Sequence, residues 1–493
     1  MPGKFEAPRG GGRKRRKQRR SKLLWILPIL LVLVIGTLIA VQWLGKPDDT
    51  LQGPTEPTGS SENILPPNSS ETDESNTSQS TTESSSESTT ESVPELPYVV
   101  STATLSAQGD LLMHKPVINT GAKRDGSYDF ESIFRYVAPY VSAFDYAAVN
   151  LETTLGGANC GIPYQGNPLF NCPDPIVDSV VEAGYDMLLT ANNHSSDTKA
   201  AGIIRTLEQA RGVGLATLGT MLNDEEQKYS IIDVNGIQIG MLCYTYATGV
   251  TSDGRPSLNG NSHVSQAGIV NYFMENNLSK FYSEVEEHIA NMKAGGAEAI
   301  IFYIHWGIEY QIKENSTQQA IAQKLCDLGV DVIVGGHPHV VQPVALLEST
   351  VDPSHKSVCI YSLGNAVSNQ RTGVSKLFPD GYTEDGALFT VTFEKYSDGS
   401  VYLAGTDVIP TWVNMHANNG VKEYNILPLD ISREDEWIEI FDLTKQNFSA
   451  AQKSYDRTMG IVGDGLAQCQ EYLAQAKAER DQMPAADTVL PAA

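Results

Sequence analysis

The chain has 493 residues, with 35 Lys and Arg against 59 Asp and Glu, and 41% of the residues are hydrophobic. Ten of the basic residues and a single acid lie within positions 1–22, so the rest carries 25 basic and 58 acidic side chains, a net charge of −33. Such an acidic surface disfavours non-specific binding to nucleic acid, and an anionic ligand would have to be drawn in by bound cations or a local basic pocket.

The amino-terminal part is predicted to anchor the chain in a membrane. A basic tail, residues 1–22, is followed directly by the uncharged apolar segment Leu23–Gly45. As a helix this segment covers about 34 Å, enough to cross a hydrocarbon core of about 30 Å. A cleaved secretory signal is the alternative, but such signals have a shorter apolar core and a small-residue cleavage site. The positive-inside rule places the tail in the cytoplasm and the main domain outside the cell.

Residues 46–97 are mostly Ser, Thr, Glu, Pro and Asn. Too little apolar surface is present to offset the entropy of the chain, so we expect a disordered stalk. A flexible segment of this length has an end-to-end distance of about 40 Å, which would hold the following domain away from the membrane.

Residues 98–430 are expected to form one domain. Strand-like and helix-like runs alternate from residue 98 to about residue 347, which predicts an α/β fold with a mainly parallel sheet. Apolar runs predict strands at 105–109, 146–151, 187–190, 300–304 and 330–334. Amphipathic runs predict helices at 130–140, 174–183, 199–211, 279–294 and 317–328. The pair Asn235-Gly236 between two strand-like runs predicts a β-hairpin.

Two further groups of elements follow in the second half of the chain. Residues 358–362, 387–394 and 401–409 are expected to form an antiparallel sheet packed against the first. Residues 431–493 are expected to be a helical extension, with 434–448 and 450–478 forming a helical hairpin or pair.

Each of the five predicted parallel strands stops at polar residues that can bind metal. These residues are Asp110, Glu152, Asn192-Asn193-His194, His305, and the histidines of Gly335-Gly336-His337-Pro338-His339. Ligands of open α/β sheets bind beyond the carboxyl ends of the strands, so we expect these side chains to meet. Taken singly, any one of them is a turn residue or a loop hydrogen-bonding group.

The candidate ligands combine carboxylates, imidazoles and one amide. They are Asp110, Glu152, Asn193, His305, His337 and His339, with His114 four residues after Asp110. This set suits two divalent ions about 3.5–4 Å apart. Mn²⁺, Zn²⁺ or Fe²⁺ fit mixed nitrogen and oxygen ligands, whereas Ca²⁺ prefers oxygen throughout.

The six cysteines contain no Cys-x-x-Cys spacing, which argues against a thiolate zinc site. Cys160 and Cys172 lie in a Gly-, Pro- and Asn-rich loop, and a disulfide between them is left open.

Several motifs together resemble the CapA-type capsule or poly-γ-glutamate synthesis proteins, which belong with the calcineurin-like metallophosphatases. The motifs are Gly109-Asp110, Asn150-Leu151-Glu152, Ala191-Asn192-Asn193-His194-Ser195-Ser196-Asp197, His305-Trp306-Gly307-Ile308-Glu309-Tyr310, Gly336-His337-Pro338-His339 and Tyr361-Ser362-Leu363-Gly364-Asn365. They span residues 102–369, a little over half of the chain, in the family's order.

The resemblance implies a four-layer α/β/β/α metallophosphatase-like sandwich with two metal ions. Glu152 would bridge the ions, with Asn193, His305 and His337 on one and Asp110 and His339 on the other. Asp197 and Glu309 would orient imidazoles, with Asn365 as a further supporting residue. One departure is at position 112, where the phosphatases have His and this chain has Leu, so that His114 is the nearest imidazole and is included as a ligand.

The activity that the resemblance implies is hydrolysis by water that the ions activate, with His194 stabilising the transition state or protonating the leaving group. The bond attacked is a phosphoester or a γ-glutamyl amide of an anionic surface polymer. The alternative is a non-catalytic, metal-binding subunit of a membrane complex that makes and exports the polymer. Either protein would work outside the cell on a single amino-terminal span.

Overall fold

The computed structural model describes residues 96–251, 256–260, 268–418 and 420–482. The chain divides into two compact units, Met1–Thr89 and Thr90–Ala493, and all described residues belong to the second. The predicted basic tail 1–22, the apolar segment Leu23–Gly45 and nearly all of the stalk 46–97 lie outside the described residues. Within the described ranges, no helix has both the length and the apolar character needed to cross a bilayer.

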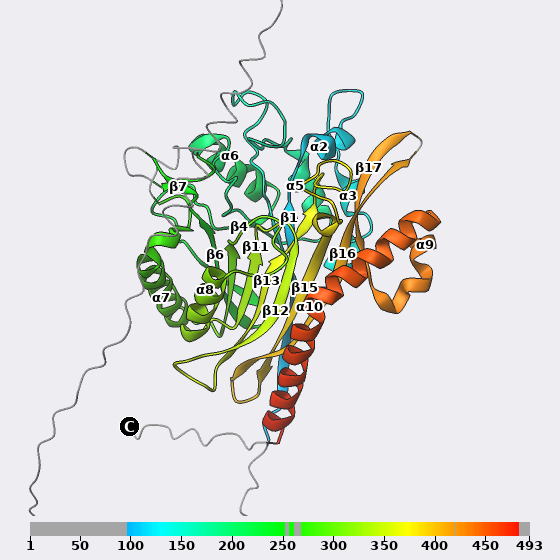
Figure 1. The fold of residues 1–493 in the computed structure, drawn as a ribbon. Coiled ribbons are helices and arrows are strands. Elements are labelled where there is room, and N and C mark those ends of the chain that lie inside the picture. Colours follow the sequence, from blue (N-terminus) through cyan, green and yellow to red (C-terminus); the bar gives the residue numbers. More distant parts are fainter. Residues whose placement is uncertain (1–95, 252–255, 261–267, 419, 483–493) are drawn as a thin grey trace, which may run out of the picture. The chain divides into compact units, whose positions relative to one another are not determined.

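Two β-sheets form the centre of the described unit (Figure 1). The first sheet has eight strands in the order β17-β16-β15-β1-β2-β3-β4, with β14 paired to β1. These are β1 (Val99–Leu111), β2 (Tyr146–Asn150), β3 (Met187–Leu189), β4 (Ala216–Leu218), β14 (Asn365–Val367), β15 (Asp385–Tyr396), β16 (Val401–Asn418) and β17 (Val421–Pro428). Strands β1 to β4 are parallel, whereas β15, β16 and β17 add antiparallel pairs. The first sheet is therefore mixed.

The second sheet has seven strands in the order β12-β13-β11-β10-β6-β5, with β9 paired to β6. These are β5 (Ser230–Val234), β6 (Ile237–Tyr246), β9 (Tyr272–Phe273), β10 (Ala299–His305), β11 (Val332–Gly336), β12 (Val341–Glu348) and β13 (Lys356–Leu363). A separate small hairpin joins β7 (Gly249–Val250) and β8 (Pro256–Ser257). The predicted hairpin at Asn235-Gly236 is confirmed between β5 and β6, and both residues have the positive φ, 54° and 80°, that its tight turn requires.

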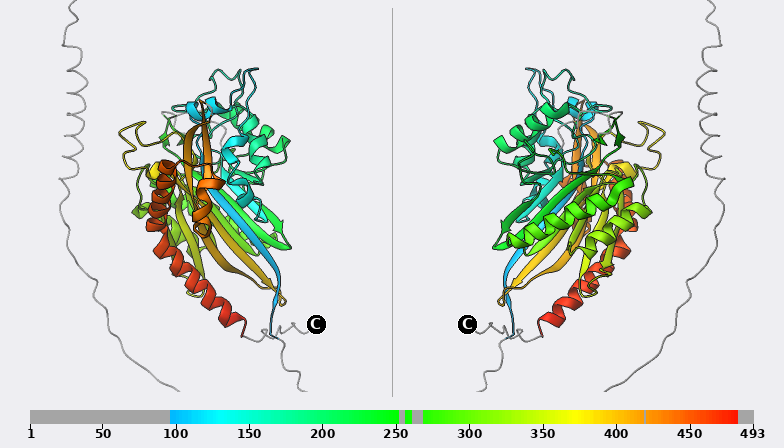
Figure 2. Two further views of the ribbon diagram at one scale, coloured as in Figure 1. Left: turned by 90° about the vertical axis from the view of Figure 1, so that its right-hand side faces the viewer. Right: turned by 90° about the vertical axis from the view of Figure 1, so that its left-hand side faces the viewer.

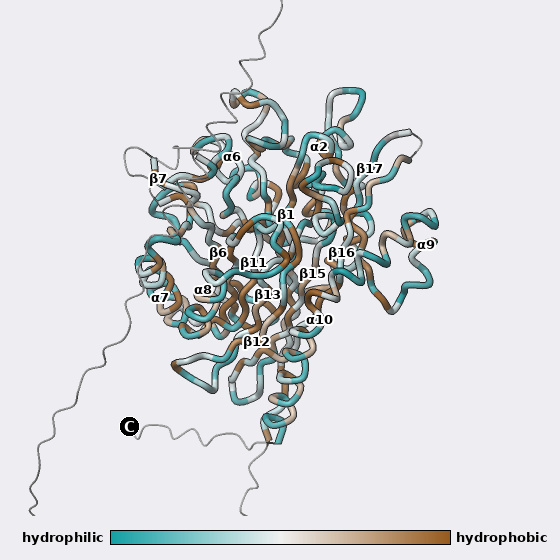
Figure 3. Tube along the Cα trace, viewed as in Figure 1, coloured by the Kyte–Doolittle hydropathy of each residue, from teal (hydrophilic) through white to brown (hydrophobic). Residues whose placement is uncertain are grey.

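The hydrophobic core lies between the two sheets and continues on their outer faces. Every residue of β10 is buried, because successive side chains of the strand point to opposite faces and both faces are covered. Ile301 and Tyr303 share one cluster with Leu105 of the first sheet. Phe302 belongs instead to a cluster with residues of the outer helices, such as Leu325. Apolar segments accordingly gather along the central strands (Figure 3).

Helices cover the outer faces of both sheets. Four pack on the first sheet, namely α2 (Lys115–Gly121), α3 (Glu131–Phe134), α4 (Ala138–Val141) and α5 (Pro175–Glu182). Two pack on the second, α7 (Leu278–Ala294) and α8 (Ser316–Asp327), drawn in green in the right-hand view of Figure 2. Helix α6 (Lys199–Gly212) follows β3 and contacts β4. The described unit is thus a mixed α/β sandwich, in agreement with the predicted class.

The helix predicted at 130–140 is instead two short helices, α3 and α4. Pro139 stands in the first turn of α4. Because proline has no backbone N–H, it cannot continue a preceding helix but can begin a new one. The prediction of a single helix here was wrong for this reason.

The assignment of strands to sheets also differs from the prediction. Strand β13, which contains residues 358–362, pairs with β11 and β12 in the second sheet. Strands β15 and β16 instead extend the first sheet, with β15 antiparallel to β1. The five strands expected to lie in one parallel sheet are divided, with β1, β2 and β3 in the first sheet and β10 and β11 in the second.

The carboxyl-terminal helices do not form the predicted hairpin. After η4 (Ile431–Glu436) and the short α9 (Trp437–Ile440), a single helix of 36 residues, α10 (Lys445–Arg480), runs through the expected break. Its start is fixed by Thr444, whose hydroxyl accepts a hydrogen bond from the Asn447 N–H. Nothing between residues 448 and 450 interrupts the helix, so the prediction of two helices was wrong.

Helix α10 packs against strands of both sheets, β16 of the first and β12 of the second (Figure 1). Val462, Leu466 and Leu473 belong to the same core cluster as the residues between the sheets. A Cβ at Gly465 would lie 1.7 Å from the Val344 carbonyl oxygen, so the helix touches the backbone of β12 and only glycine fits there. The helix is therefore part of the central core.

Replacing Arg457 with Met is expected to lower the free energy of unfolding by about 3–5 kcal/mol, because it leaves the buried Asp385 carboxylate without its cation. The guanidinium donates from Nε to Oδ2 and from Nη2 to Oδ1 of Asp385, both at 2.6 Å. Urea unfolding measures the change. Arg433→Met is the matched control, because Arg433 pairs with Glu436 on the surface and its loss should cost less than about 1 kcal/mol. Equal effects of the two substitutions would show that the Arg457–Asp385 ion pair contributes no more to stability than a surface pair does.

Candidate metal centre

The polar strand ends of the two sheets meet at one place. Asp110 lies near the end of β1, and Glu152 follows β2, both in the first sheet. His305 ends β10, and His337 and His339 follow β11, in the second sheet. Because β1 is parallel to β2 and β10 is parallel to β11, the strands within each sheet deliver these residues to the same edge. The centre is therefore built where the sheets face each other.

Five of the predicted ligands form two overlapping groups. The ligand atoms of Asp110, Glu152 and His305 all lie within 4.8 Å of one another, and so do those of Glu152, His337 and His339. Glu152 Oε1 is 3.5 Å from His305 Nε2 and 3.8 Å from His339 Nε2. All five side chains are buried. Glu152 is common to both groups, as a bridging residue would be.

Asn193, the sixth predicted ligand, lies against the first of these groups. Its side-chain oxygen is 2.8 Å from His305 Nε2. Its amide nitrogen donates to the side chain of Asn259 at 3.3 Å, so the oxygen is the atom turned toward the imidazole. Asn193 can therefore supply an oxygen ligand next to His305.

Unpartnered buried atoms test whether this site suits a cation. Both carboxylate oxygens of Glu152, and Nδ1 of His337, are buried without a hydrogen-bond partner among the described residues. Leaving such atoms unpartnered costs free energy, which divalent ions would remove by accepting their lone pairs. The donors are carboxylate, imidazole and amide groups, the mixed set that Mn²⁺, Zn²⁺ and Fe²⁺ prefer. The residues present therefore fit a metal centre.

The protonation of the site also suits metal binding. Burial lowers the pKa of His305 to about 3 and holds the pKa of His337 well below its usual value, so both imidazoles are neutral at pH 7. Burial, reinforced by the charge of Asp110, raises the pKa of Glu152 well above the usual value. Metal ligands must be deprotonated, so the two histidines are ready to bind, whereas Glu152 must give up a proton.

The end of β11 and the turn that follows it require unusual backbone conformations. A Cβ at Gly335 would lie 2.0 Å from the Tyr361 carbonyl oxygen, which only glycine avoids. His337 and His339 have φ values of 97° and 57°, in the left-handed region that side-chain-bearing residues seldom adopt. Such strain persists where the surrounding structure imposes it, and it is common at functional sites. Here it directs two imidazoles to one centre.

Further amides hold the ligands in place. Asn150 donates to Asp110 Oδ1 at 2.7 Å, and Asn192 donates to the side-chain oxygen of Asn150 at 3.1 Å. Asn365, predicted as a supporting residue, donates to the His339 carbonyl oxygen at 3.2 Å and so holds the backbone of that turn. Asn150 and Asn192 belong to the conspicuous motifs, but the sequence assigned them no role.

His194 and Asp197 form a pair at the side of the centre. His194 Nδ1 is 2.7 Å from Asp197 Oδ2, an oxygen that also accepts the Phe170 N–H at 2.5 Å. The Asp197 side chain is fully buried, and the ring of His194 rests on that of Phe170 with centroids 4.5 Å apart. Asp197 thus fixes the orientation of this imidazole. Asn259, which the sequence did not single out, contacts the same imidazole at 3.2 Å.

His114 and Glu309 stand apart from the two groups. Nδ1 of His114 lies 3.2 Å from the Leu112 carbonyl oxygen and 3.3 Å from the Asn369 N–H, and its ring packs beside Phe170. His114 belongs to neither ligand group found among the described residues. Glu309 is exposed, and its charge helps to raise the pKa of Glu152.

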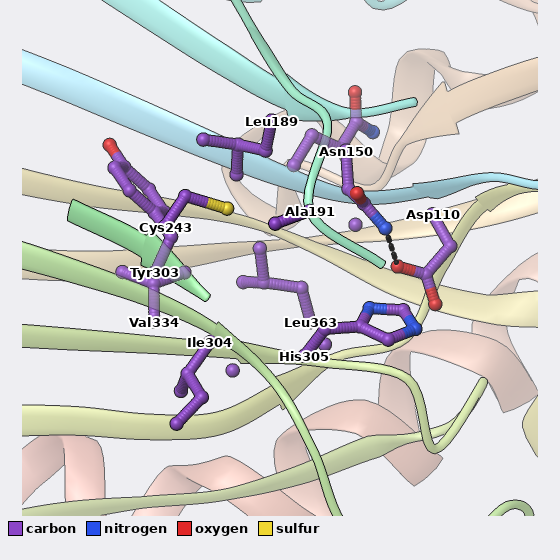
Figure 4. A pocket seen from close by; sticks show the side chains of 14 residues that line it. Asp110, Asn150, Leu189, Ala191, Cys243, Tyr303, Ile304, His305, Val334 and Leu363 are labelled. Carbon is purple, nitrogen blue, oxygen red and sulfur yellow. Dashed lines mark hydrogen bonds between the residues drawn. The ribbon is translucent and has the colours of Figure 1, made fainter. Parts of the chain in front are cut away.

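The space beneath the centre, between the sheets, is a cavity with a mainly apolar lining. Asp110, Asn150 and His305 stand at one side of it, and Leu189, Val334 and Leu363 are among its apolar walls (Figure 4). Apolar walls strengthen the electrostatic interactions of the charged groups above them.

The cysteines contribute no ligand to the centre. Cys160 and Cys172, for which the sequence left a disulfide open, are both free thiols in this structure. Cys243 lines the cavity, where burial raises the pKa of its thiol to about 12.

Comparison with known families agrees with this arrangement of motifs. A family model described as "Bacterial capsule synthesis protein PGA_cap" matches residues 104–370, more than half of the chain. The chain belongs to this family. The predicted resemblance to the CapA-type proteins is thereby confirmed, and the match contains every predicted ligand.

Two curated relatives carry CapA names. The "Capsule biosynthesis protein CapA" of Bacillus anthracis is 29% identical over 317 residues, which cover 62% of this chain and 66% of that protein. The "PGA biosynthesis protein CapA" of Bacillus subtilis (strain 168) is 27% identical over 319 residues, covering 63% and 73%. The chain thus spans just under two thirds of the first relative.

Among solved structures, the crystal structure of TT1561 of Thermus thermophilus aligns with 58% of this chain and 94% of that one. Its sequence identity is 9% and its TM-score 0.30, values too low to establish a common fold.

Proposed function

We propose that this PGA_cap protein is a metal-dependent hydrolase that processes an anionic surface polymer, poly-γ-glutamate or a similar capsule polymer, during its synthesis. The observation that carries the proposal is Glu152, a buried carboxylate common to two ligand groups whose two oxygens lack hydrogen-bond partners among the described residues. Its fold would then be the four-layer sandwich of the calcineurin-like metallophosphatases.

In the proposed centre, two divalent ions would share Glu152. As the family resemblance implies, Asn193, His305 and His337 would hold one ion and Asp110 and His339 the other, so each ion would draw ligands from both of the groups described above. Bound Mn²⁺, Zn²⁺ or Fe²⁺ would supply a Lewis acid for a phosphoryl or amide oxygen and lower the pKa of water. Asn150 and Asn365 keep Asp110 and the His339 backbone in position through the hydrogen bonds described above.

His194 is the proposed proton donor. Asp197 Oδ2 lies 2.7 Å from Nδ1, and Nε2 lies 3.3 Å from the side-chain nitrogen of Asn259. In the proposed role, Nε2 would hold the proton for a leaving group or an oxyanion. The buried Asp197 carboxylate behind it holds the ring in this orientation. The bond cleaved would be a phosphoester or a γ-glutamyl amide.

The proposed location is outside the cell, on a single span formed by Leu23–Gly45, with residues 1–22 in the cytoplasm. The uncharged apolar run beside ten basic residues supports this arrangement. The acidic character of residues 23–493 would repel an anionic polymer, so the bound ions themselves would attract it.

A second candidate is a metal-binding subunit that assembles or exports the polymer without turnover, together with other subunits of a polymer-synthase complex. Position 112 favours it, because Leu112 stands where the metallophosphatases have a histidine and His114 belongs to neither ligand group among the described residues. The ion held by Asp110 and His339 would then have fewer protein ligands than its neighbour.

The test compares the full-length chain with its His305→Ala variant, both incubated with Mn²⁺. Each receives a generic phosphodiester and, separately, γ-linked glutamate oligomers. We expect product from one substrate in the natural chain, and loss of both product and bound metal in the variant, because His305 lies 3.5 Å from Glu152. Metal without product from either substrate favours the assembly role. Unchanged metal content in the variant, by elemental analysis, contradicts the centre.

A further inference from the structure

Tyr246 stands beside the proposed centre with no role assigned so far. It is the last residue of β6, which runs parallel to β10 with Thr245 in register with His305. Its hydroxyl oxygen is 3.1 Å from Nε2 of His337, and the two rings pack with centroids 4.8 Å apart. The tyrosine therefore touches a proposed ligand from outside the ligand set.

The two nitrogens of His337 have different surroundings. Nε2 faces the Tyr246 hydroxyl, whereas Nδ1 is buried with no hydrogen-bond partner among the described residues. A neutral imidazole carries one proton, on one nitrogen or the other. A proton on Nδ1 would leave a buried N–H without an acceptor, whereas a proton on Nε2 can be donated to the tyrosine oxygen. The second arrangement leaves the Nδ1 lone pair available.

We propose that Tyr246 is a positioning residue for the metal centre: by accepting a hydrogen bond from His337 Nε2, it selects the tautomer whose Nδ1 binds the ion. This inference rests on the proposed metal centre. Metal-ligating histidines commonly donate their second N–H to an acceptor that fixes the ring, and losing that acceptor typically weakens metal binding 10- to 100-fold.

A matched control lies two residues earlier on the same strand. Tyr244 shares the strand face of Tyr246, and its hydroxyl donates one hydrogen bond, to Glu284 at 3.3 Å. Each Tyr→Phe change therefore removes a single hydroxyl and a single hydrogen bond from the same side of β6. Only the change at 246 removes a contact with a proposed ligand.

The test titrates full-length natural chain, Tyr246→Phe and Tyr244→Phe with Mn²⁺ by calorimetry, after thermal unfolding has shown that all three fold. We expect 10- to 100-fold weaker binding for Tyr246→Phe and unchanged binding for Tyr244→Phe. Equal affinities of the two variants overturn the role of Tyr246. Absence of Mn²⁺ binding by the natural chain refutes the metal centre itself, which is a different outcome.

A double substitution tests whether Tyr246 acts through His337. His337→Gly keeps the left-handed backbone, φ 97°, and removes the imidazole. On that background, Tyr246→Phe should change the remaining Mn²⁺ affinity less than about twofold, because the group it positions is gone. A further tenfold loss would mean that the tyrosine acts independently of His337, and the proposal would be wrong.

Discussion

Glu152→Gln is expected to abolish metal binding and, in the metal-free protein, to increase stability. The amide keeps the size of the side chain but cannot bridge two ions with a carboxylate charge. Because Glu152 belongs to both ligand groups and would be shared by both ions, its replacement should affect the two ions together. We expect at least a roughly 100-fold drop in Mn²⁺ affinity, about 3 kcal/mol of binding free energy, measured by calorimetry and elemental analysis.

The stability effect should depend on pH. Burial raises the pKa of Glu152 well above its unfolded value of 4.5, so the folded protein holds this proton more tightly than the unfolded chain. The stability that this bound proton contributes is complete below pH 4.5 and is lost as the pH rises through the pKa of Glu152 in the folded protein. The variant has no such proton to lose. In urea unfolding without metal, the free energy of unfolding of the variant should therefore exceed that of the natural chain only slightly at about pH 5. The difference should reach about 1–3 kcal/mol at about pH 8.

Glu309→Gln provides the control for both measurements. Glu309 lies close enough to influence Glu152 but is exposed, so its replacement should leave metal affinity and stability nearly unchanged. Retention of both ions by Glu152→Gln, or a loss of stability that grows with pH, would show that this carboxylate is not the bridge.

His194→Ala should separate catalysis from metal binding. We expect turnover of the cleaved substrate to fall by about 10²- to 10⁴-fold, the usual effect of removing a general acid, with unchanged metal content. His194 belongs to neither ligand group among the described residues, and its ring is held by Asp197 and Phe170 instead. Turnover is measured under saturating Mn²⁺, together with elemental analysis of the same sample.

Asp197→Asn extends this test. The asparagine retains the hydrogen bond from the Phe170 N–H, made at 2.5 Å to the natural carboxylate, but removes the charge behind the imidazole. A smaller loss of turnover than in His194→Ala is expected, again with full metal content. If His194→Ala loses metal, the histidine is a ligand, and if it keeps full turnover, the proton donor lies elsewhere.

That the candidate ligands lie close together could be predicted from the sequence, because each of them stands at the end of a predicted strand. Asp110, His305 and His337 each follow a run of residues that predicts a strand. Parallel strands present their carboxyl ends at one edge of a sheet, so residues at these ends lie close together. The division of those strands between two sheets could not be predicted. Both faces of β1 and β10 are largely buried, so the two strands have similar apolar sequences. Such a sequence does not indicate which of the two sheets a strand joins.

The supporting residues were harder to find. Asn150 and Asn192 act through side-chain hydrogen bonds whose partners lie about 40 residues away in the chain, which no local pattern reveals. Tyr246 ends a strand and has the appearance of an ordinary packing residue. The surroundings of His114 could not be predicted either, because its separation of four residues from Asp110 does not determine that the ring lies beside Phe170 and the Asn369 N–H.

The position of α10 has a consequence for solubility. β12 is an edge strand of the second sheet, and such edges pair readily with other chains unless they are covered. Through Gly465 the helix touches the backbone of this strand, and through Leu466 and Leu473 it covers apolar side chains of the core. A chain cut before Lys445 would expose an unpaired edge beside an apolar strip, and aggregation would follow even though every proposed metal ligand was still present.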